Sequence, residues 1–430
     1  MRATKTIFAL SVTVLVAAGC APTQSAGPGG QGGDEKTGTV RVWLFDEANR
    51  APKEAAVGEA IAEFKAAHAG VEVDVQWIPV EGRADKFSGA FNDPTNAPDV
   101  AEFGNTDVAS YAETGALADL GGDLQSWKEG ADLLPSVLDT AKVNGKVYGL
   151  PWYTGIRALY YRTDVFAELG LQPPATLPQL AETARTIRAA KPDLYGISVG
   201  GKYTYAMLPY LWANGGEIAR QDGSRWTTAL TAENAKAGVS AYAQLIKPDI
   251  CPPESCANFT GTQSVQAFAG GKAAMTIGGD FNRKAVDQGA SAGKYAVVPL
   301  PGNEPGSIAP AFAGGNLLGV FGGSKRRGLA VEFIELLASS KYQAKMYAAM
   351  GNLPTLGGVQ QQLAASDQFL RPFVDTLKAG TKFVPSTPAW SRIDAQNILP
   401  TAIQQIATGE QNVNAALGAA AEKMNNAFGG

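Results

Sequence analysis

The sequence predicts an α/β protein whose C-terminal third is helical. Residues 71–78 alternate apolar and polar side chains, as a half-buried strand does. Val57, Ile61 and Phe64 recur at helical spacing just before this strand, and another alternating strand precedes that helix. Strand, helix and strand within about forty residues favour a parallel pair joined by a crossover helix. After Ser340 the pattern is almost wholly helical.

The same patterns predict the other elements in chain order. Strands are expected at residues 40–44, 71–78, 99–103, 156–161, 195–199, 273–277 and 316–321. Thr176 is expected to begin a helix, and Thr106 and Ser324 are expected to cap the helices that follow them. No loop is long enough to separate two independent domains. The strands are therefore expected to form two groups with crossings between them.

Residues 1–19 are interpreted as a signal peptide. Arg2 and Lys5 give the start a positive charge, and residues 7–18 form an apolar run. This run is too short to span a bilayer. Its length fits the apolar region of an export signal, so the protein is expected to be exported.

A lone cysteine follows the apolar run. The stretch Ala17-Ala18-Gly19-Cys20 resembles a bacterial lipobox, in which the peptidase cuts before the cysteine and the thiol carries diacylglycerol. Ala17 stands where Leu or Val is usual, and an ordinary secreted protein is the alternative. Residues 20–38 are rich in Gly, Ser, Pro and Gln, so they are interpreted as a flexible tether. The body would then be anchored through Cys20 to the outer face of the cell membrane, or be periplasmic.

Composition limits the class of partner. The net charge of −4 becomes −6 once Arg2 and Lys5 are removed, which argues against nucleic acid or heparin-like partners. Cys251 and Cys256 are expected to form a local disulfide in an exported protein. A zinc site is the rival, but the only histidine, His68, lies far away in sequence. We expect no metal and no cofactor.

Aromatic and polar side chains follow several predicted strands. Ligands of open α/β sheets bind outside the carboxyl ends of the strands. Sugars stack their C–H faces on aromatic rings and pair their hydroxyls with amides and carboxylates, so this combination predicts a sugar cleft. The residues that suggest it are Glu47, Asn105, Thr106, Trp152, Tyr153, Trp212, Asn214, Asp280, Phe281, Gly315, Asn316 and Trp390.

Longer stretches carry a family resemblance. They include APDVAEFGNTDVASYAETGALADL, VNGKVYGLPWYTGIRALYYRTDVFAELGL, PYLWANGG, FAGGKAAMTIGGDF, FAGGNLLGVFGGSKRRGLAVEFIELLAS and GNLPT. In this order, from Val40 onward, the chain resembles the extracellular solute-binding proteins of carbohydrate ABC transporters, of the maltose-binding type. The resemblance implies a two-lobed periplasmic-binding-protein fold with a hinge of crossing segments. One lobe would hold residues 39–152 plus 318–350, and the other residues 153–317 plus 351–430.

The resemblance also implies a ligand site and partners. The site would comprise Glu47, Phe103, Asn105, Thr106, Trp152, Tyr153, Arg157, Trp212, Asn214, Asp280, Phe281, Gly315, Asn316 and Trp390. Asp280 and Phe281 depart from the Gly-Pro-Trp of many relatives. The lobes would close on a di- or oligosaccharide, and the loaded monomer would dock on a membrane permease driven by a separate ATPase. No catalytic residue is expected.

Two other functions stay open on the sequence. A binding protein for a polyamine, a metal chelate or a phosphonate would favour a strongly charged cleft. A secreted glycoside hydrolase would need two carboxylates about 5–10 Å apart, and Glu47 and Asp280 could face each other. A Ser-His-Asp enzyme is disfavoured, because His68 is expected on a helix surface. The sequence has no Gly-x-x-x-x-Gly-Lys-Ser/Thr loop, so ATP hydrolysis by that route is excluded.

Overall fold

The computed structural model describes residues 34–47, 50–80, 82–93 and 95–429. The predicted signal peptide, the lipobox at Cys20 and the tether up to residue 33 lie outside the described residues. The last tether residues contact the body, since Glu35 donates its backbone N–H to Lys325 and Asp34 accepts the N–H of Gly328. None of the described helices is long and apolar enough to cross a membrane.

The larger sheet has five strands in the order β2-β1-β3-β13-β6. Their bounds are β1 (Gly38–Asp46), β2 (Val71–Pro79), β3 (Val100–Gly104), β6 (Leu150–Gly155) and β13 (Gly314–Val320). β1 is parallel to both β2 and β3, whereas β13 is antiparallel to β3 and β6. Helix α1 (Arg50–Ala67) joins β1 to β2, which confirms the predicted crossover.

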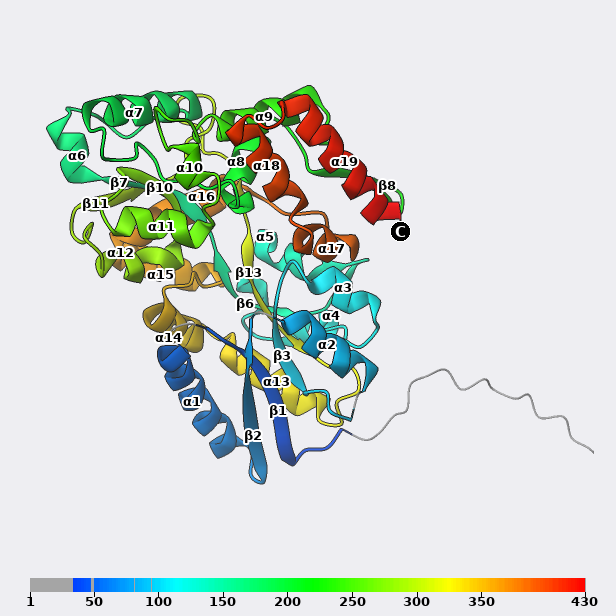
Figure 1. Ribbon diagram of the computed structural model, residues 1–430. Coiled ribbons are helices and arrows are strands. Elements are labelled where there is room, and N and C mark those ends of the chain that lie inside the picture. Colours follow the sequence, from blue (N-terminus) through cyan, green and yellow to red (C-terminus); the bar gives the residue numbers. More distant parts are fainter. Residues whose placement is uncertain (1–33, 48–49, 81, 94, 430) are drawn as a thin grey trace, which may run out of the picture. The chain divides into compact units, whose positions relative to one another are not determined.

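A second sheet has three antiparallel strands in the order β10-β7-β11. These are β7 (Arg157–Arg162), β10 (Met275–Gly279) and β11 (Tyr295–Val298). β6 of the larger sheet ends at Gly155, and β7 begins two residues later, so the chain crosses directly from one sheet to the other. Two sheets with crossings between them are what the grouping of the strands predicts (Figure 1).

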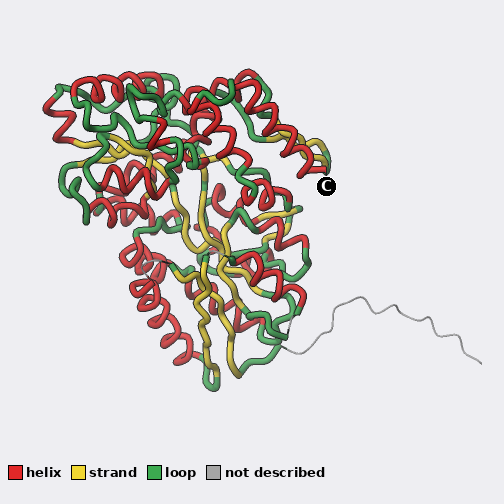
Figure 2. Tube along the Cα trace, viewed as in Figure 1, coloured by secondary structure: helices red, strands yellow, loops and turns green. Residues whose placement is uncertain are grey.

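Helices and short strands surround the two sheets (Figure 2). Before residue 200 they are α2 (Arg83–Asn92), α3 (Val108–Glu113), α4 (Gly121–Ser126), α5 (Pro135–Leu138), β4 (Lys142–Val143), β5 (Lys146–Val147), α6 (Thr163–Glu168) and α7 (Leu177–Ala190). Residues 200–339 add α8 (Thr204–Ala213), β8 (Ala219–Asp222), β9 (Arg225–Thr228), α9 (Glu233–Ala243), α10 (Pro253–Cys256), α11 (Gly261–Ala269), α12 (Arg283–Asp287), β12 (Ala311–Phe312) and α13 (Arg327–Leu337). The C-terminal part holds α14 (Ser340–Met350), α15 (Gly357–Ser366), α16 (Arg371–Ala379), β14 (Thr381–Lys382), α17 (Ala389–Ala395), α18 (Ile398–Thr408) and α19 (Val413–Gly429). Four 3-10 turns complete the described elements: η1 (Gly130–Asp132), η2 (Asp139–Ala141), η3 (Asp280–Asn282) and η4 (Gln368–Leu370). The helical C-terminal third is confirmed.

The larger sheet buries both of its faces. Val42 and Leu44 of β1 pack into a cluster that includes Phe64 of α1 and Phe333 of α13. Trp43 and Phe45, which alternate with them, join a cluster that includes Phe87 of α2 on the opposite face. Figure 1 shows α1 and α2 on opposite sides of these strands. Alternation along a strand therefore sends successive side chains into two different cores.

Three local predictions are wrong. Residues 195–199 make only two isolated bridges to the segment at β10, from Tyr195 and Ser198, and do not form a continuous strand. Thr106 does not cap α3. The residue at the N-cap position of that helix is Asp107, and its side chain makes no capping hydrogen bond. Ser324 does not cap α13. Its hydroxyl accepts the N–H of Arg326 before the helix begins, and Asp34 accepts the N–H of Gly328 at the start of the helix. By contrast, Thr176 caps α7 as predicted.

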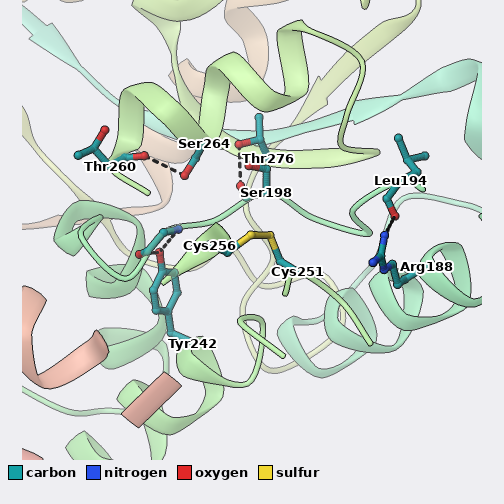
Figure 3. Close-up of a disulfide and its surroundings, with 10 residues drawn as sticks. Arg188, Leu194, Ser198, Tyr242, Cys251, Cys256, Thr260, Ser264 and Thr276 are labelled. Atoms are coloured by element: carbon teal, nitrogen blue, oxygen red, sulfur yellow. Dashed lines mark hydrogen bonds between the residues drawn. A yellow bond between two sulfur atoms is a disulfide. The ribbon is translucent and has the colours of Figure 1, made fainter. Parts of the chain in front are cut away.

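The disulfide lies in the core that surrounds the second sheet (Figure 3). Cys251 and Cys256 are joined, with their Cα atoms 6.0 Å apart, and both side chains are fully buried. The carbonyl of Cys256 accepts the N–H of Gly201, and the hydroxyl of Tyr242 donates to the carbonyl of Gly200. The linked loop thus supports the backbone at Gly201, and Tyr242 of α9 supports Gly200, just before α8 begins.

Candidate functional site

A cavity of about 330 Å³ lies where the two sheets meet. It opens at the carboxyl ends of β1 and β3, the position at which open α/β sheets bind ligands. One wall comes from the larger sheet and its loops, and the other comes from Arg157 of β7, Tyr205 of α8, Phe281 of η3 and Phe312 of β12. The lining residues are Phe45, Glu47, Val80, Arg83, Gly104, Asn105, Thr106, Tyr153, Gly155, Arg157, Tyr205, Phe281, Phe312, Gly314, Gly315, Asn316 and Asn352.

Several lining polar groups keep bonding capacity for a ligand. Asn105 donates its side-chain amide to the carbonyl of Ala313 at 2.8 Å, which leaves its own carbonyl oxygen as an acceptor. The hydroxyl of Thr106 and the amide of Asn352 make no hydrogen bond to other described side chains or backbone groups. An unpaired polar group costs little only while water or a ligand reaches it. These groups therefore suit a ligand rich in hydroxyls.

Aromatic rings line the second-sheet side of the cavity. Tyr205 and Phe312 stack with ring centroids 4.5 Å apart. Phe281 is the one large hydrophobic side chain that is exposed among the described residues, at 38%. Arg157 lies over this group, with its guanidinium carbon 5.1 Å from the Tyr205 ring and 5.9 Å from the Phe281 ring. The rings offer flat apolar faces and Arg157 offers N–H donors beside them.

The floor of the cavity is a buried polar network. The hydroxyl of Tyr153 lies 2.5 Å from Oε1 of Glu102, and the amide of Asn316 donates to both of these residues at 2.6 Å. Lys53 reaches the same carboxylate at 2.8 Å, and the backbone N–H of Phe45 donates to it at the same distance. Burial and the neighbouring carboxylates raise the pKa of Tyr153, so its hydroxyl stays protonated and donates.

Gly315 is required by this close packing. A Cβ at this position would lie 2.4 Å from the carbonyl oxygen of Tyr153 on the adjacent strand. Real Cβ atoms do not approach so closely, so only glycine lets β13 pair with β6 here. The pairing in turn brings the side chains of Tyr153 and Asn316 together.

Eight of the fourteen predicted site residues line this cavity. They are Glu47, Asn105, Thr106, Tyr153, Arg157, Phe281, Gly315 and Asn316. The other six are Phe103, Trp152, Trp212, Asn214, Asp280 and Trp390, and none of them lines it.

Four of these six are aromatic residues buried in hydrophobic cores. Phe103 and Trp152 are fully buried, and the indole N–H of Trp152 donates to the carbonyl of Leu337. Trp212 and Trp390 lie in the core around the second sheet, with at most 4% of either side chain exposed. A ring without exposed surface has no face on which a sugar can stack, so we remove these four from the candidate site.

Asn214 and Asp280 serve the backbone. Asn214 follows α8 and donates its side-chain amide to the carbonyl of Tyr210. The carboxylate of Asp280 accepts the N–H of Ile156 at 2.8 Å and the N–H of Leu353 at 3.0 Å, and the side chain is fully buried. Burial raises the pKa of Asp280 to about 7, against the effect of these two hydrogen bonds. Asp280 has no exposed surface and does not line this cavity, so the structure does not bring it to the ligand as the acceptor that the sequence predicts.

Two more cavities adjoin the first. A cavity of about 290 Å³ shares Arg157, Tyr205 and Phe281 with it and extends toward Lys202 and Asp394. A cavity of about 750 Å³ shares Glu47, Tyr153, Phe281, Asn316 and Asn352 with it and extends toward α12 and α14. Phe281 lines all three, so the three cavities adjoin one another around this ring, and we refer to them together as the cleft.

A separate cavity of about 770 Å³ lies at the other end of the larger sheet. It is lined by Arg41 near the start of β1 and by Phe321 just after the end of β13. This is the opposite end of β1 from Glu47, and none of the predicted site residues lines it. We therefore place the candidate site in the cleft. No group of three His, Cys, Asp or Glu side chains in the described part of the chain could hold a metal ion.

Sequence reasoning missed several lining residues. Arg83, Tyr205, Phe312 and Asn352 all line the cavity. Tyr205 and Arg83 lie at the starts of helices and not at the end of a predicted strand. Phe312 lies just before the Gly-Gly-Asn turn, and Asn352 belongs to the GNLPT stretch. These two residues could have been predicted from their closeness to those stretches.

The fold and the cleft define a class: a two-lobed binding protein of mixed α/β structure, with a ligand site between two sheets. The chain matches the family described as bacterial extracellular solute-binding protein over residues 47–344. This match covers more than half of the chain, and the protein belongs to that family.

Two curated relatives cover almost the whole chain. One is the diacetylchitobiose-binding protein DasA of Streptomyces coelicolor, which is 28% identical over 91% of this chain and 90% of its own length. Another is the galactooligosaccharide-binding protein of Bacillus subtilis, which is 25% identical over 97% of this chain and 95% of its own length. Both are named for the sugar that they bind.

Solved structures agree with the fold. The sugar-binding protein MalE of Xanthomonas citri superimposes with a TM-score of 0.80 at 25% identity, over 91% of this chain and 98% of its own. A solute-binding protein of an ABC transporter from Thermotoga lettingae, solved with α-D-tagatose, gives a TM-score of 0.75 at 26% identity, over 91% and 99% of the two chains. The two-lobed periplasmic-binding-protein architecture is therefore established for this protein.

Proposed function

We propose that this protein captures a di- or oligosaccharide in the cleft around Phe281 and delivers it to the permease of an ABC importer. The observation that carries the proposal is the joint lining of the cleft. Exposed or half-buried rings lie beside polar groups whose bonding capacity is not used within the described chain. Sugars need both kinds of contact at once. Relatives named for oligosaccharides support the same ligand class.

The size of the cleft supports more than one sugar unit. The cavities on either side of the first one share its lining residues, so a ligand can continue past Phe281 in two directions. We assign the lobes as residues 39–152 plus 318–350 and residues 153–317 plus 351–430. The larger sheet includes β6 up to Gly155 and β13 from Gly314, which supports crossings within a few residues of the edges at 152 and 318. The ligand would favour closure of the lobes, because it binds the closed form more tightly than the open form.

We also propose that the protein is a monomer and not an enzyme. A glycosidase needs two carboxylates across the cleft, and the pair considered from the sequence was Glu47 and Asp280. Asp280 is fully buried and accepts two backbone N–H groups. Glu47 is the one carboxylate among the residues that line the central cavity, and Asp394 lines the neighbouring cavity that extends toward Lys202. A single carboxylate in the central cavity favours a binding role.

Anchoring through Cys20 belongs to the same proposal. A lipid on Cys20 and a tether of the predicted length would hold the body within roughly 25 Å of the membrane. Metabolic labelling with a radioactive fatty acid tests this directly. The wild-type protein is expected to take up label and the Cys20→Ser variant is not. Equal labelling of both would exclude this anchor.

A thermal-shift screen tests the binding function. The full chain, purified in detergent, is heated with mono-, di- and oligosaccharides, with a polyamine and with a phosphonate. A ligand at one hundred times its Kd adds about 2.7 kcal/mol of stability. A shift with a sugar that is recovered intact by mass spectrometry supports sugar capture. A shift with the polyamine or the phosphonate alone, or recovery of a cleaved sugar, would favour the other two functions.

A further inference from the structure

Lys53 is a fully buried lysine directly below the cleft. It lies on the inward face of α1 with Ala56, Val57 and Phe64, where an apolar residue would be expected. Its ammonium is 3.2 Å from Glu47, 2.8 Å from Glu102 and 5.1 Å from the centroid of the Trp152 ring. Lys53 does not line any of the three cleft cavities, so it contacts no ligand there. A buried charge is retained only where it is paired, and here it is paired with two carboxylates.

The carboxylates of Glu102 and Glu47 differ in whether they can accept a further hydrogen bond. Glu102 is fully buried, and each of its oxygens already accepts from Lys53. One oxygen also accepts from Tyr153 and Asn316, and the other from the N–H of Phe45. Glu102 therefore has no capacity left for a ligand. It fixes the directions of the side chains around it.

Glu47 is placed differently. The hydroxyl of Tyr153 has a single proton, and it lies 2.5 Å from Glu102 but 3.0 Å from Glu47. The shorter contact takes that proton, because a hydroxyl donates one hydrogen bond. The ammonium of Lys53 is then the one donor that holds Glu47 within the described chain. Among the described residues no group donates to the second oxygen of Glu47, and Glu47 lines both the central cavity and the one toward α14.

Two arginines near the cleft form ion pairs with other carboxylates. Arg50 lies 3.4 Å from Asp46 and 3.0 Å from Glu54, and Arg83 lies 3.0 Å from Asp107. Among the described residues, Lys53 is the one cation within 4.0 Å of Glu47.

We propose that Lys53 is a positioning residue for ligand recognition, which holds the Glu47 carboxylate in the cleft as the acceptor for an uncharged donor of the ligand, a hydroxyl or an amide N–H. The proposal rests on the proposed sugar-binding function. Lys53 acts through Glu47, so the effects of changing the two residues should not add. Its charge also balances Glu102, so its loss should reduce stability as well.

A double-mutant cycle on sugar affinity tests this. Isothermal titration of the full chain in detergent uses N,N′-diacetylchitobiose, maltose and galactobiose as probes. Glu47→Gln and Lys53→Met are each expected to weaken binding of the accepted probe at least tenfold, and the double variant by no more than either single one. Lys65→Met is the matched control on the same helix. Lys65 forms an exposed pair with Glu72, and its removal should leave affinity unchanged.

A second variant separates positioning from stability. Lys53→Met combined with Glu102→Gln removes both buried charges, so the melting temperature should return toward the wild-type value. Affinity should stay at least tenfold weaker, because Glu47 still lacks its ammonium partner. Recovery of affinity together with stability, or multiplicative losses in the Glu47 and Lys53 cycle, would overturn the proposal. Failure of the wild type to bind any sugar would instead overturn the proposed function, and this inference with it.

Discussion

The carboxylate of Asp280 accepts the backbone N–H of Ile156 at 2.8 Å, across the point where the chain leaves β6 and enters β7. Its other oxygen accepts the N–H of Leu353, whose segment bridges to Thr154 of β6. One buried side chain thus ties together two crossing segments next to the cleft. Asp280 is a structural residue of the hinge region, and its ionisation should matter for stability.

Asp280→Asn should change how stability depends on pH. Burial raises the pKa of Asp280 to about 7, from 3.8 in the unfolded chain. The stabilising contribution of a group with a raised pKa is fully present below the unfolded value and is lost as pH rises through the folded value. The melting temperature of the variant minus that of the wild type should therefore rise between pH 4 and pH 7. A difference that stays constant over this range would contradict the assignment.

Phe281→Ala should weaken sugar binding without unfolding the protein. Its ring is partly exposed and borders all three cavities, so it loses ligand contact rather than core packing. Loss of a stacking ring costs about 1–3 kcal/mol, or roughly five- to more than a hundredfold in Kd. Isothermal titration measures the change. Trp226→Ala, on a half-buried ring of β9 away from the cleft, is the control and should leave the affinity unchanged.

Trp152→Ala and Trp390→Ala should chiefly destabilise the fold. The two indoles are 0% and 1% exposed, so truncation leaves a cavity in each core. Such changes cost about 3–5 kcal/mol. Urea unfolding should show a lower midpoint for both variants. A variant that unfolds like the wild type but loses sugar binding would return its tryptophan to the ligand site.

Gly315→Ala should disturb the cleft floor. The added methyl group would meet the carbonyl of Tyr153 at 2.4 Å, so β13 and β6 would have to separate locally. Both stability and sugar affinity are expected to fall. Gly418→Ala in α19 is the matched control, because its methyl group meets no atom within 4 Å. In a helix this change should stabilise slightly, by up to about 1 kcal/mol. Equal effects of the two variants would contradict the packing described.

Removal of the disulfide should lower stability more than affinity. Closing a loop as short as that between Cys251 and Cys256 is worth about 2 kcal/mol by loop entropy. The Cys251→Ser and Cys256→Ser double variant should therefore unfold at lower urea concentration. Because the loop bonds to Gly201 and none of its residues lines the cleft, the change in Kd should stay within a few-fold. A loss of binding as large as that of Phe281→Ala would place the loop in the site.

The strands that could be predicted from the sequence are those with a strong local pattern. Residues 71–78 alternate cleanly because one edge of the larger sheet is half buried, and that alternation fixed β2. Residues 195–199 have the composition of a strand but bridge to the β10 segment at only two points. Tertiary packing decides whether a partner strand lies alongside such a segment. A few residues of sequence carry no information on that packing.

The candidate site shows the same limit. Glu47, Asn105 and Asn316 could be predicted because strand ends and turns gather at one edge of the sheet. Trp152 and Trp390 were also predicted for the site, but both rings are buried, because residue type says nothing about which way a ring points. Lys53 could have been noticed, since it interrupts the apolar face of α1. Its partners, Glu47 and Glu102, lie on different strands, and only the fold brings the three together.

The most direct test of sugar capture is isothermal titration of the full chain in detergent with N,N′-diacetylchitobiose, maltose and galactobiose, side by side with Phe281→Ala. Saturable binding of one of these sugars at a one-to-one ratio, weakened by the substitution, is the predicted result. No heat of binding with any sugar, or binding that Phe281→Ala leaves unchanged, would contradict a sugar site in this cleft.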